Sequence, residues 1–231
     1  MQEKQADRGK VGELFQELRS VLSGRGKALD AILPPLLYTV VNTLFGLIPA
    51  SVVALCAAAT VVILRAARRE SWGYAAAGFG LTSFAAGMAW ISRTSAAFFL
   101  PGIVSGGLLL AAALVSIAIR RPLAALSSHL TRGWPLDWYA LDSIRPAYAE
   151  VTWAWAALVA GRLAVFLYLL ARGEGVVLGW ASIALGWPAI VLVLAGSYIY
   201  GLRRLRTLGG PGVEEFRTGT PPPWKGQGRG F

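Results

Sequence analysis

Cysteine, histidine and acidic residues are scarce in this 231-residue chain, which has one Cys, one His and 12 Asp or Glu residues. Because Cys56 has no second cysteine to pair with, no disulfide can form within the chain. So few Cys and His residues also argue against a zinc site of the usual kind. We therefore expect no metal site and no cofactor.

Carboxylates are absent from all the long apolar segments of the sequence. Proton- or sodium-coupled transporters usually place Asp or Glu at mid-membrane, so this absence disfavours that class. Catalysis within a membrane would need paired carboxylates, a serine with a base, or a metal cluster. His129, the single imidazole, is interpreted as a loop residue at the membrane interface. We predict no catalytic residues and no enzymatic activity.

Apolar residues are abundant: 55% of the chain is hydrophobic, 15% is charged, and the mean hydropathy is +0.55. This composition is too apolar for a soluble domain. The net charge of +10 is concentrated in short loops and in both terminal segments, so nucleic acid is not expected as a partner. The composition predicts an integral membrane protein.

A helix needs about 20 apolar residues to cross a bilayer. The sequence predicts six such spans, at residues 31–47, 49–64, 73–91, 97–119, 151–171 and 176–200. The first two are short and nearly continuous, so a buried hairpin that does not cross fully is the alternative there. Gly186-Trp187-Pro188 predicts a kink in the sixth span, because proline removes a backbone hydrogen bond.

The predicted fold is all-α, with the six transmembrane helices paired in three hairpins. Residues 1–30 form a cytoplasmic N-terminal segment, in which apolar residues recur at helical spacing from Val11 to Leu22 and predict an amphipathic helix. Residues 31–203 form the membrane domain. Residues 204–231 are predicted to be a flexible cytoplasmic tail, and its Gly- and Pro-rich part from Gly209 to Phe231 is predicted to be disordered.

Basic residues follow alternate predicted spans and therefore lie on one side of the membrane. In the predicted topology only Arg93 and Arg172 fall on the other side. Positive charge marks the cytoplasmic side of a membrane protein, so both termini are predicted to be cytoplasmic. Arginines at this boundary are candidates for contact with anionic phospholipid. The candidate residues are Arg68, Arg69, Arg120, Arg121, Arg203 and Arg204.

Polar residues within the predicted spans form the second candidate site. Tyr38, Thr39, Asn42 and Thr43 fall on one side of the first span, opposite its apolar residues. Their role is either hydrogen bonding between helices or a pathway for a solute or lipid headgroup. Arg162, near the centre of the fifth span, should face the protein interior, either to hold helices together or to bind an anion or lipid phosphate.

An ordered set of short motifs extends over most of the chain. The set comprises Ser23-Gly24-Arg25-Gly26, Val41-Asn42, Gly46-Leu47, Arg68-Arg69-Glu70, Arg93-Thr94, Phe98-Phe99-Leu100-Pro101-Gly102-Ile103, Arg120-Arg121-Pro122-Leu123, Arg145, Tyr148, Arg162 and Gly186-Trp187-Pro188. It resembles a bacterial, actinobacterial-type family of multi-pass membrane proteins called domain of unknown function 3159, which is distantly similar to intracellular septation protein A. The resemblance implies a protein of the bacterial cytoplasmic membrane and implies no particular activity.

These observations favour a membrane scaffold or envelope-associated factor that binds anionic lipid. The alternative is a transporter or channel for a small anion or lipid that uses the polar side of the first span and Arg162. The expected partners are the lipid bilayer and anionic phospholipid, while a homo-oligomer or contact with other membrane proteins remains open.

Overall fold

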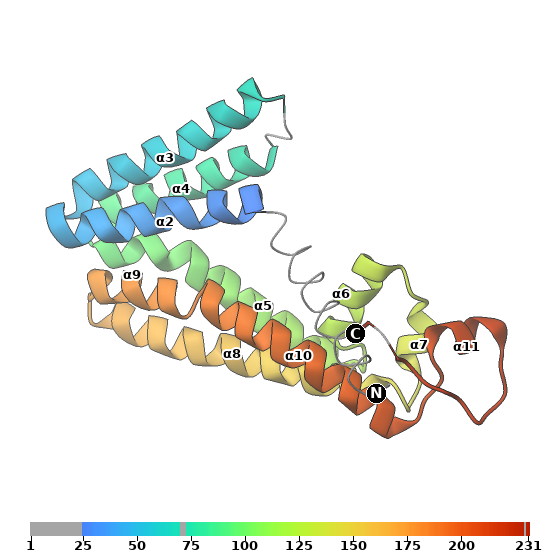
Figure 1. Cartoon of the computed structure of the whole chain (residues 1–231). Helices are drawn as coiled ribbons and strands as arrows, with labels where there is room; N and C mark the ends of the chain where they lie inside the picture. Colours follow the sequence, from blue (N-terminus) through green and yellow to red (C-terminus); the bar gives the residue numbers. More distant parts are fainter. Residues whose placement is uncertain (1–24, 70–72, 229) are drawn as a thin grey trace, which may run out of the picture. The chain divides into compact units, whose positions relative to one another are not determined.

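The computed structural model describes residues 25–69, 73–228 and 230–231, which form helices and turns and, within these ranges, no strand (Figure 1). The all-α prediction is therefore confirmed. The amphipathic helix predicted between Val11 and Leu22 lies outside the described residues. The elements are α2 (Arg25–Phe45), α3 (Leu47–Ala67), α4 (Gly73–Ser92), η1 (Ser95–Phe99), α5 (Leu100–Ala118), α6 (Leu123–Arg132), α7 (Leu136–Ala140), α8 (Arg145–Ala171), α9 (Gly175–Ala184), α10 (Trp187–Leu208) and α11 (Val213–Thr218).

Long apolar helices dominate the described part of the chain, as a membrane-embedded protein requires. Five segments are long and apolar enough to cross a bilayer: Leu47–Ala67, Gly73–Ser92, Ser95–Ala118, Arg145–Ala171 and Gly175–Leu208. They correspond to the second to sixth predicted spans. The first predicted span contains a shorter apolar helix, Ile32–Phe45.

The chain divides into two compact units. The first contains Met1–Ser105 and Ala164–Pro188, and the second contains Gly106–Leu163 and Ala189–Phe231. Three helices, α5, α8 and α10, have residues in both units, and α10 has only Trp187 and Pro188 in the first.

In the first unit, α2, α3 and α4 lie side by side (Figure 1). Ala50, Ala54 and Ala58 are buried on one side of α3, where their four-residue spacing lets neighbouring backbones approach closely. Gly46 alone separates α2 from α3 and has a φ of 81°, which glycine adopts without steric cost. Helices η1 and α9 contact each other, and α9 also contacts α2.

In the second unit, the short helices α6, α7 and α11 gather beside one end of α8 and α10 (Figure 1). Their apolar side chains form a core with residues from the ends of the long helices. The buried members of this core are Ala125, Trp138, Tyr139, Ile144, Ala147, Tyr148, Leu205 and Val213. We call this part of the second unit the aromatic cap.

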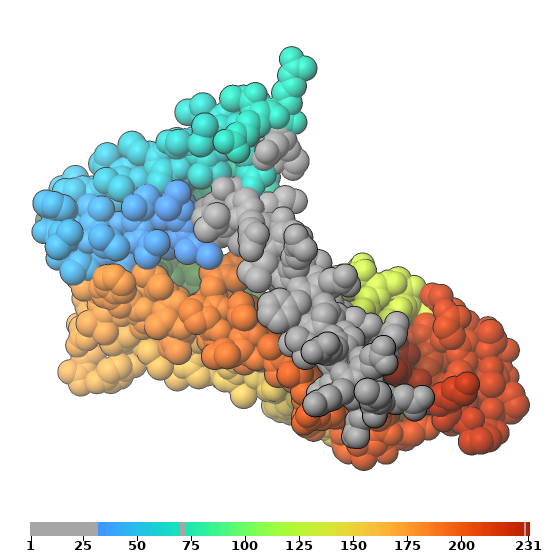
Figure 2. All heavy atoms as spheres, in the orientation of Figure 1, coloured from blue at the N-terminus to red at the C-terminus, as the bar shows by residue number. Residues whose placement is uncertain are grey.

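The tail differs from the prediction of disorder, because residues 210–228 have a defined path that includes α11. Figure 2 shows these red C-terminal residues as one contiguous mass of atoms. The Trp138 indole Nε1 donates a 2.9 Å hydrogen bond to the Pro211 carbonyl oxygen. A Cβ atom on Gly210 would lie 2.6 Å from the Ser143 hydroxyl oxygen, so this glycine allows a close backbone approach. Glycine in this tail therefore permits packing, which its composition alone did not indicate.

The predicted kink at Gly186-Trp187-Pro188 is confirmed as an interruption, because α9 ends at Ala184 and α10 begins at Trp187. A Cβ atom on Gly186 would lie 2.6 Å from the Ser182 carbonyl oxygen. Pro188 occupies the first turn of α10, where no intrahelical partner for a backbone N–H is needed.

Candidate functional site

The polar side of α2 is packed within the first unit. Tyr38, Thr39 and Asn42 are 0%, 1% and 6% exposed. The Tyr38 hydroxyl donates to the Ser95 carbonyl oxygen at 3.0 Å, and its ring stacks on that of Phe98 with centroids 3.6 Å apart. Three of the four predicted polar residues of this span thus meet protein atoms rather than open space.

The two threonines of this group bond within their own helix. The Thr39 hydroxyl donates to the Pro35 carbonyl oxygen and the Thr43 hydroxyl to the Thr39 carbonyl oxygen, both at 2.8 Å. Thr43 is exposed, whereas Thr39 lies against Gly179 of α9, where an added Cβ would be 2.7 Å from the Thr39 hydroxyl oxygen. This packing favours helix association over a solute pathway as the role of the polar side.

The residues that cover this side were missed by sequence reasoning. Gly175 and Gly179 of α9 allow close approach to η1 and α2, respectively. Two glycines separated by three residues form a small-residue pattern of the kind that joins membrane helices. That spacing is visible in the sequence and could have predicted a helix contact, although not the identity of the partner.

Arg162 belongs to the second unit, whereas the polar residues of α2 belong to the first. Its side chain is half-buried on α8. The grouping of Arg162 with Tyr38, Thr39, Asn42 and Thr43 therefore stays a prediction.

Five of the six arginines predicted to contact lipid are exposed: Arg68, Arg69, Arg120, Arg121 and Arg203. Arg69 and Arg120 follow α3 and α5 with φ values of 54° and 58°. A non-glycine residue in this left-handed conformation costs about 1 kcal/mol, and glycine is the usual residue at such helix ends. Arg93, which follows α4, has the same conformation, with a φ of 55°.

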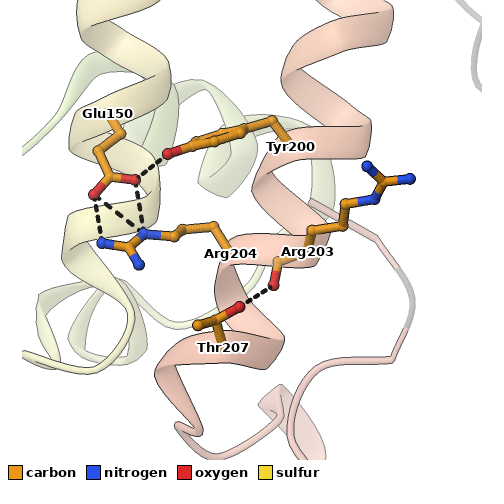
Figure 3. Close-up of polar contacts among 5 residues, drawn as sticks. All are labelled: Glu150, Tyr200, Arg203, Arg204 and Thr207. Carbon is orange, nitrogen blue, oxygen red and sulfur yellow. Dashed lines mark hydrogen bonds and ion pairs between the residues drawn. The ribbon is translucent and has the colours of Figure 1, made fainter.

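Arg204 differs from these arginines because it is held by Glu150 (Figure 3). Its Nη2 and Nε atoms donate to the two carboxylate oxygens of Glu150 at 2.8 and 2.9 Å, and the Tyr200 hydroxyl donates to the same carboxylate at 2.7 Å. Such two-point pairing fixes the guanidinium in one orientation. Arg204 therefore joins α8 to α10. Sequence reasoning missed this role because Glu150 is distant in the chain and precedes the predicted fifth span.

His129 lies in the last turn of α6, not in a loop as interpreted from the sequence, and its partner lies in the turn between α6 and α7. Its Nδ1 atom lies 2.6 Å from the Trp134 carbonyl oxygen. Within residues 25–69, 73–228 and 230–231, no group of three or more His, Cys, Asp or Glu side chains could hold a metal ion.

The Glu215 carboxylate links the start of α11 to the backbone at Lys225 and Gly226. It accepts hydrogen bonds from the backbone N–H groups of Gly212 and Lys225, both at 2.8 Å, and of Gly226 at 3.1 Å. These bonds, led by that of Gly212, hold the pKa of the Glu215 carboxyl below its usual value. A carboxylate of this kind stabilises the folded tail only while it is ionised.

This lowered pKa predicts a pH dependence of stability. Because the folded pKa lies below the unfolded one, the contribution is fully present above the unfolded pKa, near 4.5, and is lost as pH falls through the folded pKa. We expect Glu215→Gln to flatten the fall in thermal stability below pH 4.5 relative to the parent chain. Melting followed by tryptophan fluorescence from pH 3 to 7 measures this difference. Parallel curves for the two proteins would contradict it.

The apolar helices and basic helix ends define a polytopic, all-helical membrane protein. A family model described as "Protein of unknown function (DUF3159)" matches residues 22–207, and the chain belongs to this family. Neither the curated proteins nor the solved structures gave a match. The distant similarity to intracellular septation protein A stays a prediction.

Proposed function

We propose that this protein is a non-enzymatic membrane scaffold or envelope-associated factor whose basic helix ends bind anionic phospholipid. The observation that carries the proposal is the position of exposed arginines beside exposed apolar side chains. Arg120 and Arg121 follow Ile119, which is 60% exposed, and Arg68 and Arg69 follow Leu64, which is 49% exposed. A guanidinium at the end of a lipid-facing helix lies at the depth of the headgroups.

The proposal also implies an orientation of the chain in the membrane. The basic ends are then cytoplasmic, the termini lie on the same side of a bacterial inner membrane, and the helix Ile32–Phe45 forms a sixth span.

Lipid that remains with the purified protein tests this function. We expect cardiolipin or phosphatidylglycerol to be enriched over the bulk membrane in the parent chain. Each basic residue near an anionic surface contributes about 1 kcal/mol, so the double substitution Arg120→Gln with Arg121→Gln should weaken anionic lipid binding roughly thirtyfold. Native mass spectrometry with defined lipid mixtures measures this change.

Arg93 supplies the matched control. It is exposed and also has a positive φ of 55°, but it follows α4 at the opposite end of the predicted topology. Arg93→Gln should leave anionic lipid binding within about twofold of the parent value. The proposal fails if the parent shows no anionic enrichment, or if Arg93→Gln weakens binding as much as the double substitution.

A further inference from the structure

The segment after α11 returns to the aromatic cap and is held there by backbone contacts. The Arg206 Nη2 atom donates to the Gly228 carbonyl oxygen at 3.1 Å. The Arg132 Nε atom donates to the Phe231 backbone oxygen, also at 3.1 Å. Two arginines from different helices thus hold main-chain oxygens of one short segment.

The Phe231 ring occupies a slot between two long helices. One wall is Tyr148 of α8, whose ring stacks on that of Phe231 with centroids 4.3 Å apart and an angle of 6° between the ring planes. The other wall is Gly201 of α10, where an added Cβ would overlap the Phe231 ring. Tyr148 is fully buried, and its hydroxyl has no hydrogen-bond partner among the residues that the structure describes.

The slot also selects the residue before the aromatic ring. Gly230 has a φ of 78°, a conformation that favours glycine. A Cβ atom there would lie 2.8 Å from the Arg132 Nη1 atom and 2.9 Å from the Trp134 ring. The pocket therefore accepts a glycine followed by an aromatic residue, with the aromatic residue's backbone oxygen bound by Arg132.

We propose that Tyr148, Gly201, Arg132 and Arg206 form a binding site for a glycine-rich peptide segment with an aromatic anchor, and that residues 225–228 and 230–231 of the same chain are its ligand. A partly buried ring, combined with hydrogen bonds to backbone oxygens, resembles the anchored binding of peptides. Lys225 and Gly228 are exposed. In this proposal the segment releases as a local opening, without separation of α8 from α10. The same segment of a second copy has the same chemistry.

A lysine-specific protease measures release of this segment in the full chain. Lys225 is the only lysine after Lys27, so cleavage there yields a distinct C-terminal fragment. Gly201→Ala raises the helix propensity of α10, but the added Cβ occupies the space of the Phe231 ring. Phe231→Ala removes that ring from the slot. We expect both variants to be cleaved after Lys225 about tenfold faster than the parent, corresponding to a loss of ~1.4 kcal/mol in docking.

Trp224→Ala is the control, because it removes an exposed aromatic residue from the same tail and should leave the cleavage rate unchanged.

A synthetic peptide with the sequence of residues 225–231 should bind to Phe231→Ala, quenching or shifting tryptophan fluorescence, and should not bind once Gly201→Ala is added. A cleavage rate of the parent that is independent of protein concentration supports docking in the same chain. The proposal is overturned by an unchanged rate in Gly201→Ala, by absent peptide binding, or by faster parental cleavage on dilution.

Discussion

Replacing Gly175 with valine should strongly destabilise the first unit. Gly175 is buried at the start of α9, and a Cβ there would overlap the Ser95 side chain and lie 2.6 Å from the Ala96 backbone nitrogen. Backbone cannot move aside as a flexible side chain can. Overpacking of this kind costs about 3 kcal/mol, so we expect a large fall in melting temperature in mild detergent.

Gly87→Val provides the control for this substitution. Gly87 lies within α4, and a Cβ there would meet nothing within 4 Å. Its replacement should change stability by less than about 1 kcal/mol. If Gly175→Val melted at the same temperature as Gly87→Val, close packing of α9 against η1 would be contradicted. The case for a packed polar side of α2 would then weaken, and the pathway interpretation of Asn42 would regain support.

The sequence predicted the long helices because length and hydropathy are local properties. The predicted span 73–91 corresponds to Gly73–Ser92, and the predicted span 97–119 to Ser95–Ala118. The interruption at Gly186 was also predictable, since Pro188 removes a backbone donor whatever surrounds it. The first span was harder to predict from length and hydropathy, because the apolar helix that the structure describes there, Ile32–Phe45, is short.

Contacts between distant residues were not predictable from single positions. Arg204 has the same local signature as Arg203, a basic residue near the end of an apolar run. Only the folded chain brings Glu150 to its guanidinium. The packing of the tail was not predictable for a related reason: glycine and proline disfavour regular structure, yet Trp138 supplies a donor to the Pro211 carbonyl oxygen, and Gly210 lies against Ser143 and Ile144.

Trp138→Ala should produce the largest loss of stability in the aromatic cap. The indole is fully buried, contacts the Trp134, Tyr139 and Tyr148 rings edge to face, and donates to the Pro211 carbonyl oxygen. Removing a buried tryptophan costs about 3–5 kcal/mol. Trp138→Phe keeps an aromatic ring but leaves the Pro211 oxygen without this donor, so it should cost less, with about 1 kcal/mol from the lost bond.

Thermal melting in mild detergent measures the loss of stability in both Trp138 variants. Trp153→Ala is the control for removal of a tryptophan, because Trp153 is 54% exposed on α8. Cleavage after Lys225 adds a second measurement. Trp138→Ala should both lower the melting temperature and speed cleavage after Lys225, because it opens the whole cap, whereas Gly201→Ala should speed this cleavage with little change in melting. Equal melting of Trp138→Ala and Trp153→Ala would mean that the cap adds no stability to the helices beneath it.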